Sequence, residues 1–368
     1  MDILENIPLA FYTTFYIGGP SRYLIFAQDT QEIIEAVHFA KSKNLPYLIM
    51  GGGSNRLVSN RGYEGVAIRI ENIGIDLVNE NEDTVTLRVA SGEKWDDVVK
   101  FAVEENWWGI ENLSHIPGFT GAFCVQNVGA YGQEASDVVS EVEVFDTKTD
   151  KIEILKKNQL QFGYRSSIFN SSEKGRYIIL STSLVLSKLP KPNLDYGDLQ
   201  KEFSSRLSSG DFPSIKDIRS AIIKIRNKKF PYPDTPTTGN SGSFFRGPIL
   251  TESEFELLVN KLKASFPTRE IQKLVGMKDK LKVPQGFKTP GAFLIELCGF
   301  KELTVGGAKI NSEQPAVIIN NSGSATSTDV LELYKIVSQE VYKKTSVKLG
   351  IEPELIGFQK KELEEFQV

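Results

Sequence analysis

The sequence predicts an α+β fold of two or three domains. At 368 residues the chain has room for two or three domains of roughly 150 residues each. Helical apolar spacing alternates with short strand patterns along the chain, which is typical of mixed α and β structure. A proline-rich link at residues 189–198 and a serine-rich region at residues 203–214 separate an N-terminal part from a C-terminal part. Composition is ordinary for a globular protein, with 40% hydrophobic and 24% charged residues.

Composition and charge argue against several classes of function. The formal net charge of −4 gives no global attraction to nucleic acid, so we expect no nucleic-acid partner. The acidic first residues lack the apolar run of a signal peptide and no segment is apolar enough to span a bilayer, so we expect a cytoplasmic protein without a membrane partner. Cys124 and Cys298 are expected to be lone core thiols. His38 and His115 are the only histidines, which disfavours a Ser-His-Asp triad, and we expect no metal site.

A helix and a buried strand precede the first unusual stretch of the chain. Asp29 with Glu32 three residues later is typical of a capping box, and helical apolar spacing follows. Residues 46–50 read as a short buried strand, residues 56–62 as a turn, and residues 66–70 as a further strand. This order differs from a dinucleotide-binding fingerprint of the Rossmann kind, in which a helix follows the glycines.

The first unusual stretch is a glycine loop, formed by Gly51, Gly52 and Gly53 with Ser54 and Asn55. Glycine permits positive φ and lets backbone N–H groups approach an oxyanion, while the two polar side chains add hydrogen bonds without bulk. We therefore expect this loop to bind a diphosphate through its own backbone. An ordinary tight turn is the structural alternative, because glycine motifs match by chance.

The second unusual stretch covers residues 116–133. Before it, residues 84–89 alternate as a half-buried strand should, and a helix with its apolar stripe beginning at Trp95 follows. Residues 116–133 carry little charge and several glycines, so they are too apolar for a solvent loop and too glycine-rich for a helix. We expect them to lay backbone against a flat ligand, with Gln126 and Asn127 as hydrogen-bonding groups. A buried structural loop is the alternative.

The rest of the chain completes the α+β pattern. Ser214 as N-cap and Asp217 three residues later begin a helix with a basic last turn, which suits either the helix dipole or an anion site. The other expected elements are strands at residues 141–145, 151–155, 177–186, 317–319 and 348–354, and helices near residues 252–265 and 330–341.

Five short motifs, taken together in their order, resemble one family. They are the Gly51 to Asn55 loop, Ile116-Pro-Gly with Gln126-Asn-Val-Gly-Ala-Tyr131-Gly, Tyr164-Arg165-x-Ser-x-Phe, Gly242-Ser243-Phe-Phe, and Glu352-Pro-Glu354. In this order they resemble the UDP-N-acetylenolpyruvoylglucosamine reductases, flavoenzymes of peptidoglycan precursor synthesis. The segment Leu194-Asp-Tyr196-Gly further resembles the type I subgroup, whose inserted loop places a tyrosine over the substrate.

The resemblance implies a two-subdomain FAD-binding fold of the vanillyl-alcohol-oxidase (PCMH) type and a C-terminal α+β substrate-binding domain. The domain ranges we expect are 1–75 and 76–212 for the two FAD-binding subdomains, 213–350 for the substrate-binding domain, and 351–368 for a final strand and tail. The implied cofactor is noncovalent FAD, held by Gly51, Gly52, Gly53, Ser54, Asn55, Gln126 and Asn127, with NADPH as the reductant.

The resemblance also implies the catalytic residues. Hydride would pass from NADPH to FAD and then to the methylene carbon of an enolpyruvyl ether, so the neighbouring carbon would become enolate-like. Arg165 matches the family's arginine, and Glu354 matches the glutamate that works with it as a protonated or hydrogen-bond-sharing partner. Ser243 matches the proton donor. Each residue taken alone could instead have a purely structural role: Arg165 in a surface ion pair, Glu354 as a strand-end charge and Ser243 as a turn residue.

The implied substrate is a UDP-sugar enolpyruvyl ether, and the residues that would hold it are Tyr131, Tyr196, Lys229 and Gln314. Two departures from the family pattern, Gly247 in place of an asparagine and a longer proline-rich turn after Lys229, predict intact chemistry with looser nucleotide binding. We expect a monomer. Two alternatives remain: a flavin-dependent oxidase or dehydrogenase of the same fold acting on a small alcohol or hydroxy acid, with His115 as the candidate flavin tether, and a nucleotide-sugar-binding module without activity.

Overall fold

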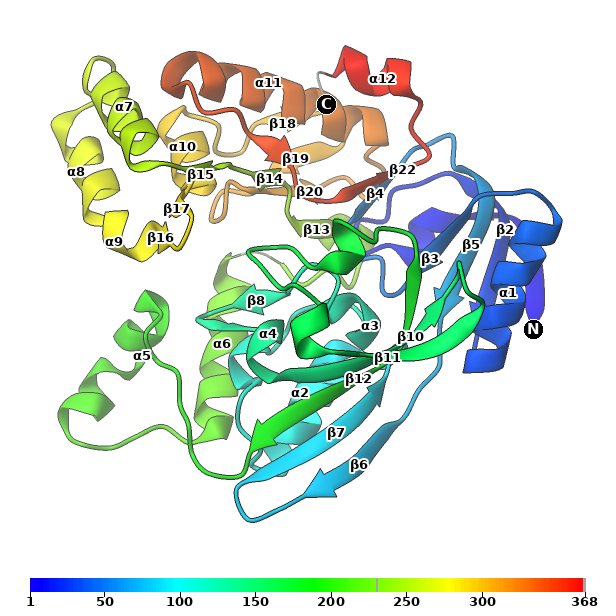
Figure 1. The fold of residues 1–368 in the computed structure, drawn as a ribbon. Helices are drawn as coiled ribbons and strands as arrows, with labels where there is room; N and C mark the ends of the chain where they lie inside the picture. The colour runs from blue at the N-terminus through cyan, green and yellow to red at the C-terminus, as the bar shows by residue number, and fades with distance from the viewer. Residues whose placement is uncertain (230, 367–368) are drawn as a thin grey trace. The chain divides into compact units, whose positions relative to one another are not determined.

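The computed structural model describes residues 1–229 and 231–366, which pack as two compact units, each with its own core (Figure 1). The last two residues of the predicted tail at 351–368 lie outside the described residues. The first unit consists of Met1–Ile7, Ser21–Gly52 and Glu64–Lys228. The second consists of Pro8–Pro20, Gly53–Tyr63 and Lys229–Val368.

The first unit contains two main sheets. One has the order β1-β2-β5-β3, and its members are β1 (Asp2–Pro8), β2 (Pro20–Ala27), β5 (Tyr63–Ile70) and β3 (Tyr47–Met50). Helix α1 (Thr30–Ser42) begins as predicted, because the Asp29 carboxylate accepts a hydrogen bond of 2.8 Å from the Glu32 N–H. The buried face of α1 packs with β5 and with Phe145, Ile178 and Leu180 of the other sheet in one core.

The other sheet of the first unit is antiparallel, in the order β11-β10-β12-β7-β6. Its members are β11 (Lys151–Lys156), β10 (Val139–Asp146), β12 (Tyr177–Ser187), β7 (Thr84–Ala90) and β6 (Ile75–Glu80). Helices α2 (Trp95–Glu104) and α6 (Ile215–Lys229) contribute to its core. Trp95 stacks on Phe123 there, with ring centroids 3.8 Å apart.

The second unit is built around a four-stranded sheet and a long helix (Figure 1). The sheet has the order β13 (Asn240–Ser243), β20 (Val317–Asn320), β19 (Ala308–Ile310) and β18 (Thr304–Val305). Helix α11 (Ser327–Thr345) packs its apolar face into the same core. Phe245 and Tyr334 stack in this core with ring centroids 5.7 Å apart.

Smaller elements surround this centre of the second unit. They are the sheet of β15 (Ile249–Leu250), β17 (Gly286–Lys288) and β16 (Lys282–Val283), and helices α7 (Glu252–Lys263), α8 (Thr268–Gly276), α9 (Lys278–Leu281), α10 (Gly291–Leu297) and α12 (Lys360–Glu365). Two further strand pairs carry predicted site residues: antiparallel β14 (Phe245–Arg246) with β21 (Gly350–Ile351), and parallel β22 (Glu354–Ile356) with β4 (Arg56–Val58).

Three local predictions were wrong. Residues 56–58, expected to be part of a turn, form strand β4, because β22 supplies a parallel partner. The expected single strand at 348–354 is two strands, β21 and β22, with different partners. Residues in the serine-rich region at 203–214 belong in part to helix α5 (Gly197–Ser208), which buries Leu199 and Phe203. In each case a tertiary partner outweighs the local composition.

The predicted four-range domain division stays a prediction. The compact units place the body of helix α6 with the first unit rather than with the residues after 212, because Ile215, Ile218, Ala221 and Ile222 are buried in the first unit's core. They also place residues 8–20 and 53–63 with the second unit. Within the described part of the chain, no helix combines the length and apolarity needed to cross a membrane.

Candidate active site

Gly52 and Gly53 of the glycine loop each lie against another segment of backbone. A Cβ added to Gly52 would lie 2.9 Å from the Gly118 Cα, so the two glycine-rich stretches singled out from the sequence touch within the first unit. Gly53 has φ 64°, and a Cβ there would lie 2.3 Å from the Tyr12 carbonyl oxygen within the second unit. Glycine is therefore required at positions 52 and 53 by close approach and, at Gly53, also by left-handed backbone.

The Asn127 side chain is hydrogen-bonded at both its nitrogen and its oxygen. Its side chain is 2% exposed, donates through Nδ2 to the Gly163 carbonyl oxygen at 3.1 Å and accepts at Oδ1 from the Ser136 N–H at 2.9 Å. Helix α3 (Thr120–Phe123) adds one helical turn to a stretch that we expected to contain none. The Asn127 side chain therefore fits the alternative in which residues 116–133 are a buried structural loop. Gln126 is half-buried.

Arg165 is held in a defined orientation next to the hairpin of β8 (Gly129–Ala130) and β9 (Gln133–Glu134). Its backbone is left-handed, with φ 52°, and its Nη1 donates to the Gly129 carbonyl oxygen at 3.1 Å. The guanidinium lies 5.9 Å from the centroid of the Tyr164 ring. A non-glycine residue with positive φ is uncommon, and the hydrogen bond to Gly129 fixes the orientation of the guanidinium.

Tyr131 and Tyr196, both expected to bind substrate, are brought together in the first unit. Their ring centroids are 5.0 Å apart at an interplanar angle of 71°, an edge-to-face contact. Tyr131 is 7% exposed and Tyr196 is 44% exposed. The loop at residues 189–196, called the tyrosine loop below, is tied to the hairpin because the Asn193 Nδ2 donates to the Gly132 carbonyl oxygen at 2.8 Å.

A buried polar network that sequence reasoning missed supports this tyrosine pair. Asn112 donates through Nδ2 to the carbonyl oxygens of Tyr131 and Asn193, both at 2.8 Å. Next to it, the fully buried Glu111 accepts from the Gln133 Nε2 at 2.9 Å. Burial raises the pKa of Glu111, although hydrogen bonds from backbone N–H groups and from Gln133 partly offset this. No sequence signal distinguishes Glu111 from a surface carboxylate.

In the second unit, Ser243 and Glu354 are carried by adjoining segments. Ser243 is the last residue of β13 and pairs in register with Val317. The next residue, Phe244, accepts a backbone hydrogen bond of 2.9 Å from Glu352, two residues before Glu354. The Glu354 N–H in turn donates to the Asn55 carbonyl oxygen at 2.9 Å. The second unit thus joins the end of the glycine loop, the Ser243 strand and the Glu354 strand.

Arg56 is the second feature that sequence reasoning missed. Its Nη2 lies 3.2 Å from the Glu354 Oε2, and the two residues are register partners in the parallel pair β4–β22. The signal available in the sequence was weak: an arginine beside the glycine loop and a glutamate near the chain end, 298 positions apart.

The remaining predicted residues lie on separate parts of the second unit. Gln314 is half-buried in a turn before β20, where its N–H donates to the Asn311 Oδ1 at 2.8 Å. Lys229 is the last residue of α6 and is half-buried. A Cβ on Gly247 would lie 2.2 Å from the Thr289 Cβ, which explains why this chain has glycine there. The predicted convergence of Arg165 with Ser243 and Glu354 stays a prediction.

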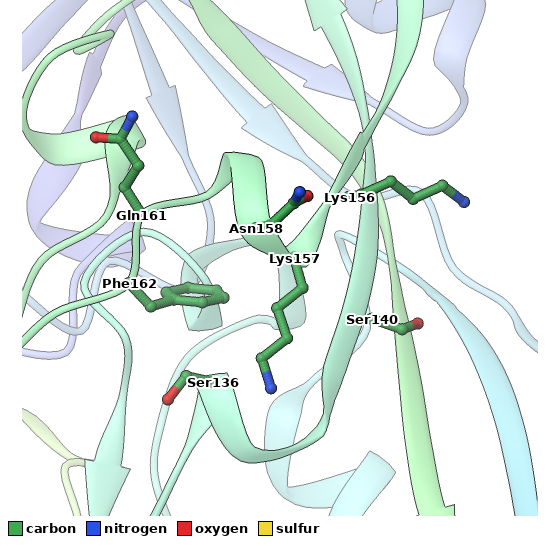
Figure 2. Close-up of a pocket in the computed structure, with 7 residues that line it drawn as sticks. All are labelled: Ser136, Ser140, Lys156, Lys157, Asn158, Gln161 and Phe162. Atoms are coloured by element: carbon green, nitrogen blue, oxygen red, sulfur yellow. The ribbon is translucent and has the colours of Figure 1, made fainter.

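A separate pocket in the first unit contains none of the predicted site residues. It is lined by Ser136, Ser140, Lys156, Lys157, Asn158, Gln161 and Phe162 (Figure 2). Figure 2 shows the Lys157 side chain reaching towards Ser136, whereas Lys156 points away, where it pairs with Glu141. The two serine hydroxyls of this pocket donate elsewhere, Ser136 to the Glu134 carboxylate and Ser140 to the Ser183 carbonyl oxygen, so we place the candidate active site at the predicted residues instead.

The buried polar side-chain atoms that have no hydrogen-bond partner among the described residues include Asn112 Oδ1, Arg56 Nη1 and Ser241 Oγ. Buried polar groups are normally satisfied, so each of these atoms is an exception within its own unit. The glycine-rich stretches at 51–53 and 118 carry no side chains that would obstruct a bound FAD. The fold and these stretches fit a flavoprotein of the FAD-binding-domain class.

Comparison with known proteins agrees with the flavoprotein class and identifies the family within it. Residues 21–155 match the family model of the FAD binding domain, and residues 234–356 match that of the UDP-N-acetylenolpyruvoylglucosamine reductase C-terminal domain. A UDP-N-acetylenolpyruvoylglucosamine reductase from Amoebophilus asiaticus is 36% identical over 96% of this chain and 99% of its own length. One from Neisseria meningitidis is 34% identical over 93% of this chain and 94% of its own length.

A solved structure shares the fold. The crystal structure of UDP-N-acetylenolpyruvylglucosamine reductase from Thermus caldophilus aligns with a TM-score of 0.64 at 24% identity, over 97% of this chain and 99% of that one. The chain belongs to the UDP-N-acetylenolpyruvoylglucosamine reductase family. This confirms the family and the fold class predicted from the sequence: a FAD-binding domain of the PCMH type followed by the reductase C-terminal domain.

Proposed function

We propose that this chain reduces UDP-N-acetylglucosamine enolpyruvate to UDP-N-acetylmuramate in peptidoglycan precursor synthesis, with bound FAD and with NADPH as the reductant. The observation that carries this proposal is the 36% identity to a named reductase over 96% of the chain. Because the FAD-binding model and the reductase C-terminal model both match, the chain is a FAD-dependent oxidoreductase. Roles in cell shape and cell division would follow from peptidoglycan synthesis.

The glycine loop and the 116–133 stretch are the proposed FAD site. When bound, FAD supplies a carrier that accepts hydride from NADPH and gives it to the enolpyruvyl methylene carbon. Gly51, Gly52 and Gly53 would present backbone N–H groups to the diphosphate, with Ser54 and Asn55 adding hydrogen bonds. Gln126 and the Asn127 backbone would face the ring system, since the Asn127 side chain is already bonded to the chain.

Arg165, Glu354 and Ser243 are the proposed catalytic residues. Negative charge develops on the carbon that bears the substrate carboxylate, and the Arg165 guanidinium, fixed by the Gly129 carbonyl oxygen, is suited to stabilise it. Ser243 would transfer its Oγ proton to the same carbon once its geometry is fixed. In support, Gly242 has φ 71°, a conformation that allows a sharp turn immediately before Ser243.

Tyr131, Tyr196, Lys229 and Gln314 are the proposed substrate-binding residues. The tyrosine pair offers an aromatic surface that is buried on one side and exposed on the other. A lysine suits a phosphate because it is a flexible point charge. The predicted weaker nucleotide binding at Gly247, the monomeric state and the cytoplasmic location stay predictions.

The test uses the purified flavin-containing protein and two half-reactions. We expect NADPH to bleach the flavin absorbance and the UDP-sugar enolpyruvyl ether to restore it without oxygen. Ser243→Ala should leave bleaching within about twofold of wild type and slow recovery at least about 100-fold, the lower range for loss of general acid catalysis. Ser265→Ala, on an exposed serine of the same unit, is the matched control and should change neither step.

Other outcomes would point to the alternatives. Yellow colour that stays with the denatured chain would indicate a covalent flavin and the oxidase alternative, with His115 as the candidate tether. The His115 Nε2 lies 2.8 Å from the Asn227 Oδ1, which already holds this ring. Bleaching without recovery on adding the UDP-sugar enolpyruvyl ether would indicate a binding module without activity. Equal slowing of both half-reactions by Ser243→Ala would contradict its role as proton donor.

A further inference from the structure

Arg56 and Glu354 form an ion pair inside the second unit at the end of the glycine loop. Arg56 begins β4 and Glu354 begins β22, and because the pairing is parallel and in register, their side chains leave the same face. The Arg56 Nη2 lies 3.2 Å from the Glu354 Oε2. The backbone fixes the pair as well, since the Glu354 N–H donates to the carbonyl oxygen of Asn55, the residue before Arg56.

The pair is half-buried. The side chain of Arg56 is 18% exposed and that of Glu354 is 37% exposed. Burial lowers the pKa of Arg56 below its ordinary value, and the charge of Glu354 partly offsets this. The guanidinium nevertheless remains charged, because an arginine does not lose its proton in a protein. The Arg56 Nη1 is also buried and has no hydrogen-bond partner among the described residues.

Holding two strands together does not require this pair. The following register partners, Leu57 with Leu355 and Val58 with Ile356, are apolar. Leu57 is fully buried in the second unit's core. Replacing a buried ion pair by well-packed apolar residues is often neutral or stabilising, and a buried donor without a partner is unfavourable. A half-buried guanidinium at this position therefore needs an explanation other than strand pairing.

We infer that Arg56 is a positioning residue that neutralises the Glu354 carboxylate and fixes its orientation for the reaction. The inference rests on the proposed function and deepens it. A bare carboxylate would oppose the negative charge that develops on the substrate, which is why the resemblance implied a protonated or hydrogen-bond-sharing Glu354. With a guanidinium 3.2 Å away, the carboxylate charge of Glu354 is compensated, so it opposes the developing charge less.

The experiment compares the two half-reactions in Arg56→Met, Arg56→Lys and the control Arg269→Met, which changes an exposed arginine of α8. Methionine keeps most of the length of the side chain and removes the charge. We expect Arg56→Met to retain flavin, to be bleached by NADPH within about twofold of wild type, and to be reoxidised by the UDP-sugar enolpyruvyl ether up to about 100-fold more slowly. Arg56→Lys should recover most of the rate, and Arg269→Met should match wild type.

A second comparison tests whether Arg56 acts through Glu354. In a Glu354→Gln background there is no carboxylate charge to neutralise, so adding Arg56→Met should slow reoxidation less than about threefold further. This double variant contains no uncompensated buried charge, and it decides the question if Arg56→Met alone fails to fold or to hold flavin.

Each result supports or contradicts a separate claim. The inference is wrong if Arg56→Met reoxidises like Arg269→Met, if Arg56→Lys is as slow as Arg56→Met, or if the Met substitution costs the same in the Glu354→Gln background. The proposed function itself fails in a different way, namely if reduced wild-type protein is not reoxidised by the UDP-sugar enolpyruvyl ether at all.

Discussion

Replacing Gly53 by alanine should destabilise the second unit and release flavin. The left-handed backbone, with φ 64°, costs an alanine about 1–2 kcal/mol. The added Cβ would lie 2.3 Å from the Tyr12 carbonyl oxygen and 2.7 Å from the Thr13 Cα. Both are backbone atoms, so the chain must shift, at an overpacking cost of about 1–3 kcal/mol. Together these terms give about 2–5 kcal/mol.

The assay is urea unfolding of the flavin-containing protein, followed in parallel by far-ultraviolet circular dichroism and by flavin release. The matched control is Gly276→Ala at the end of helix α8, where no heavy atom lies within 4 Å of the added Cβ. Alanine is the better helix former, so this control should stabilise the protein by up to about 1 kcal/mol. Gly53→Ala with an unfolding free energy within about 0.5 kcal/mol of wild type would refute the argument from close approach.

Three further predictions concern charge, thiols and the tyrosine loop. Burial alone would raise the pKa of Asp96, but hydrogen bonds from Arg219 and a backbone N–H lower this pKa overall. Asp96→Asn should therefore lower the free energy of chemical unfolding at pH 7 by about 1–3 kcal/mol. The stability difference between wild type and variant should shrink as pH falls below the ordinary aspartate pKa of 3.8. Burial raises the pKa of Cys124 to about 12 and that of Cys298 to about 11. A thiol reagent at pH 8 should therefore modify no cysteine in the native protein and both cysteines in urea. Rapid modification of the native protein would contradict the burial of these thiols. Asn193→Ala removes the 2.8 Å hydrogen bond from the tyrosine loop to the hairpin of β8 and β9. In a flavin-absorbance titration the variant should bind the UDP-sugar up to about tenfold more weakly, with its flavin content unchanged. An unaltered affinity would show that this hydrogen bond does not contribute to substrate binding.

Local patterns predicted the elements whose signals are contained within a few residues. The Asp29 N-cap marks the start of α1, with Glu32 accepting from the Gln28 N–H rather than closing a capping box. Ser214 and Asp217 mark the start of α6 by reciprocal hydrogen bonds. The strand before the glycine loop and the antiparallel pair β10–β11 follow from alternation and a turn-forming sequence. These features depend on short-range physics, so the sequence predicts them well.

The features that sequence reasoning missed depend on distant partners. Strand β4 reads as a turn until β22 is known to pair with it, and the Arg56–Glu354 ion pair comes from that same pairing. The buried Glu111 is indistinguishable from a surface carboxylate in the sequence, because its burial is decided by the hairpin that packs over it. Family resemblance named Ser243, Arg165 and Glu354 together, but it gave no hint of the groups that orient them.

The parallel pairing of β22 with β4 also has a consequence for the order of events during synthesis. Residue 354 emerges from the ribosome about 300 positions after residue 56, so β4 has no partner while the rest of the first unit and most of the second are made. A nascent or truncated chain that ends before residue 354 lacks both Glu354 and the strand that orders Arg56. On the proposed role of Glu354, reductase activity would be absent until translation is nearly complete, and a prematurely terminated product would be inactive.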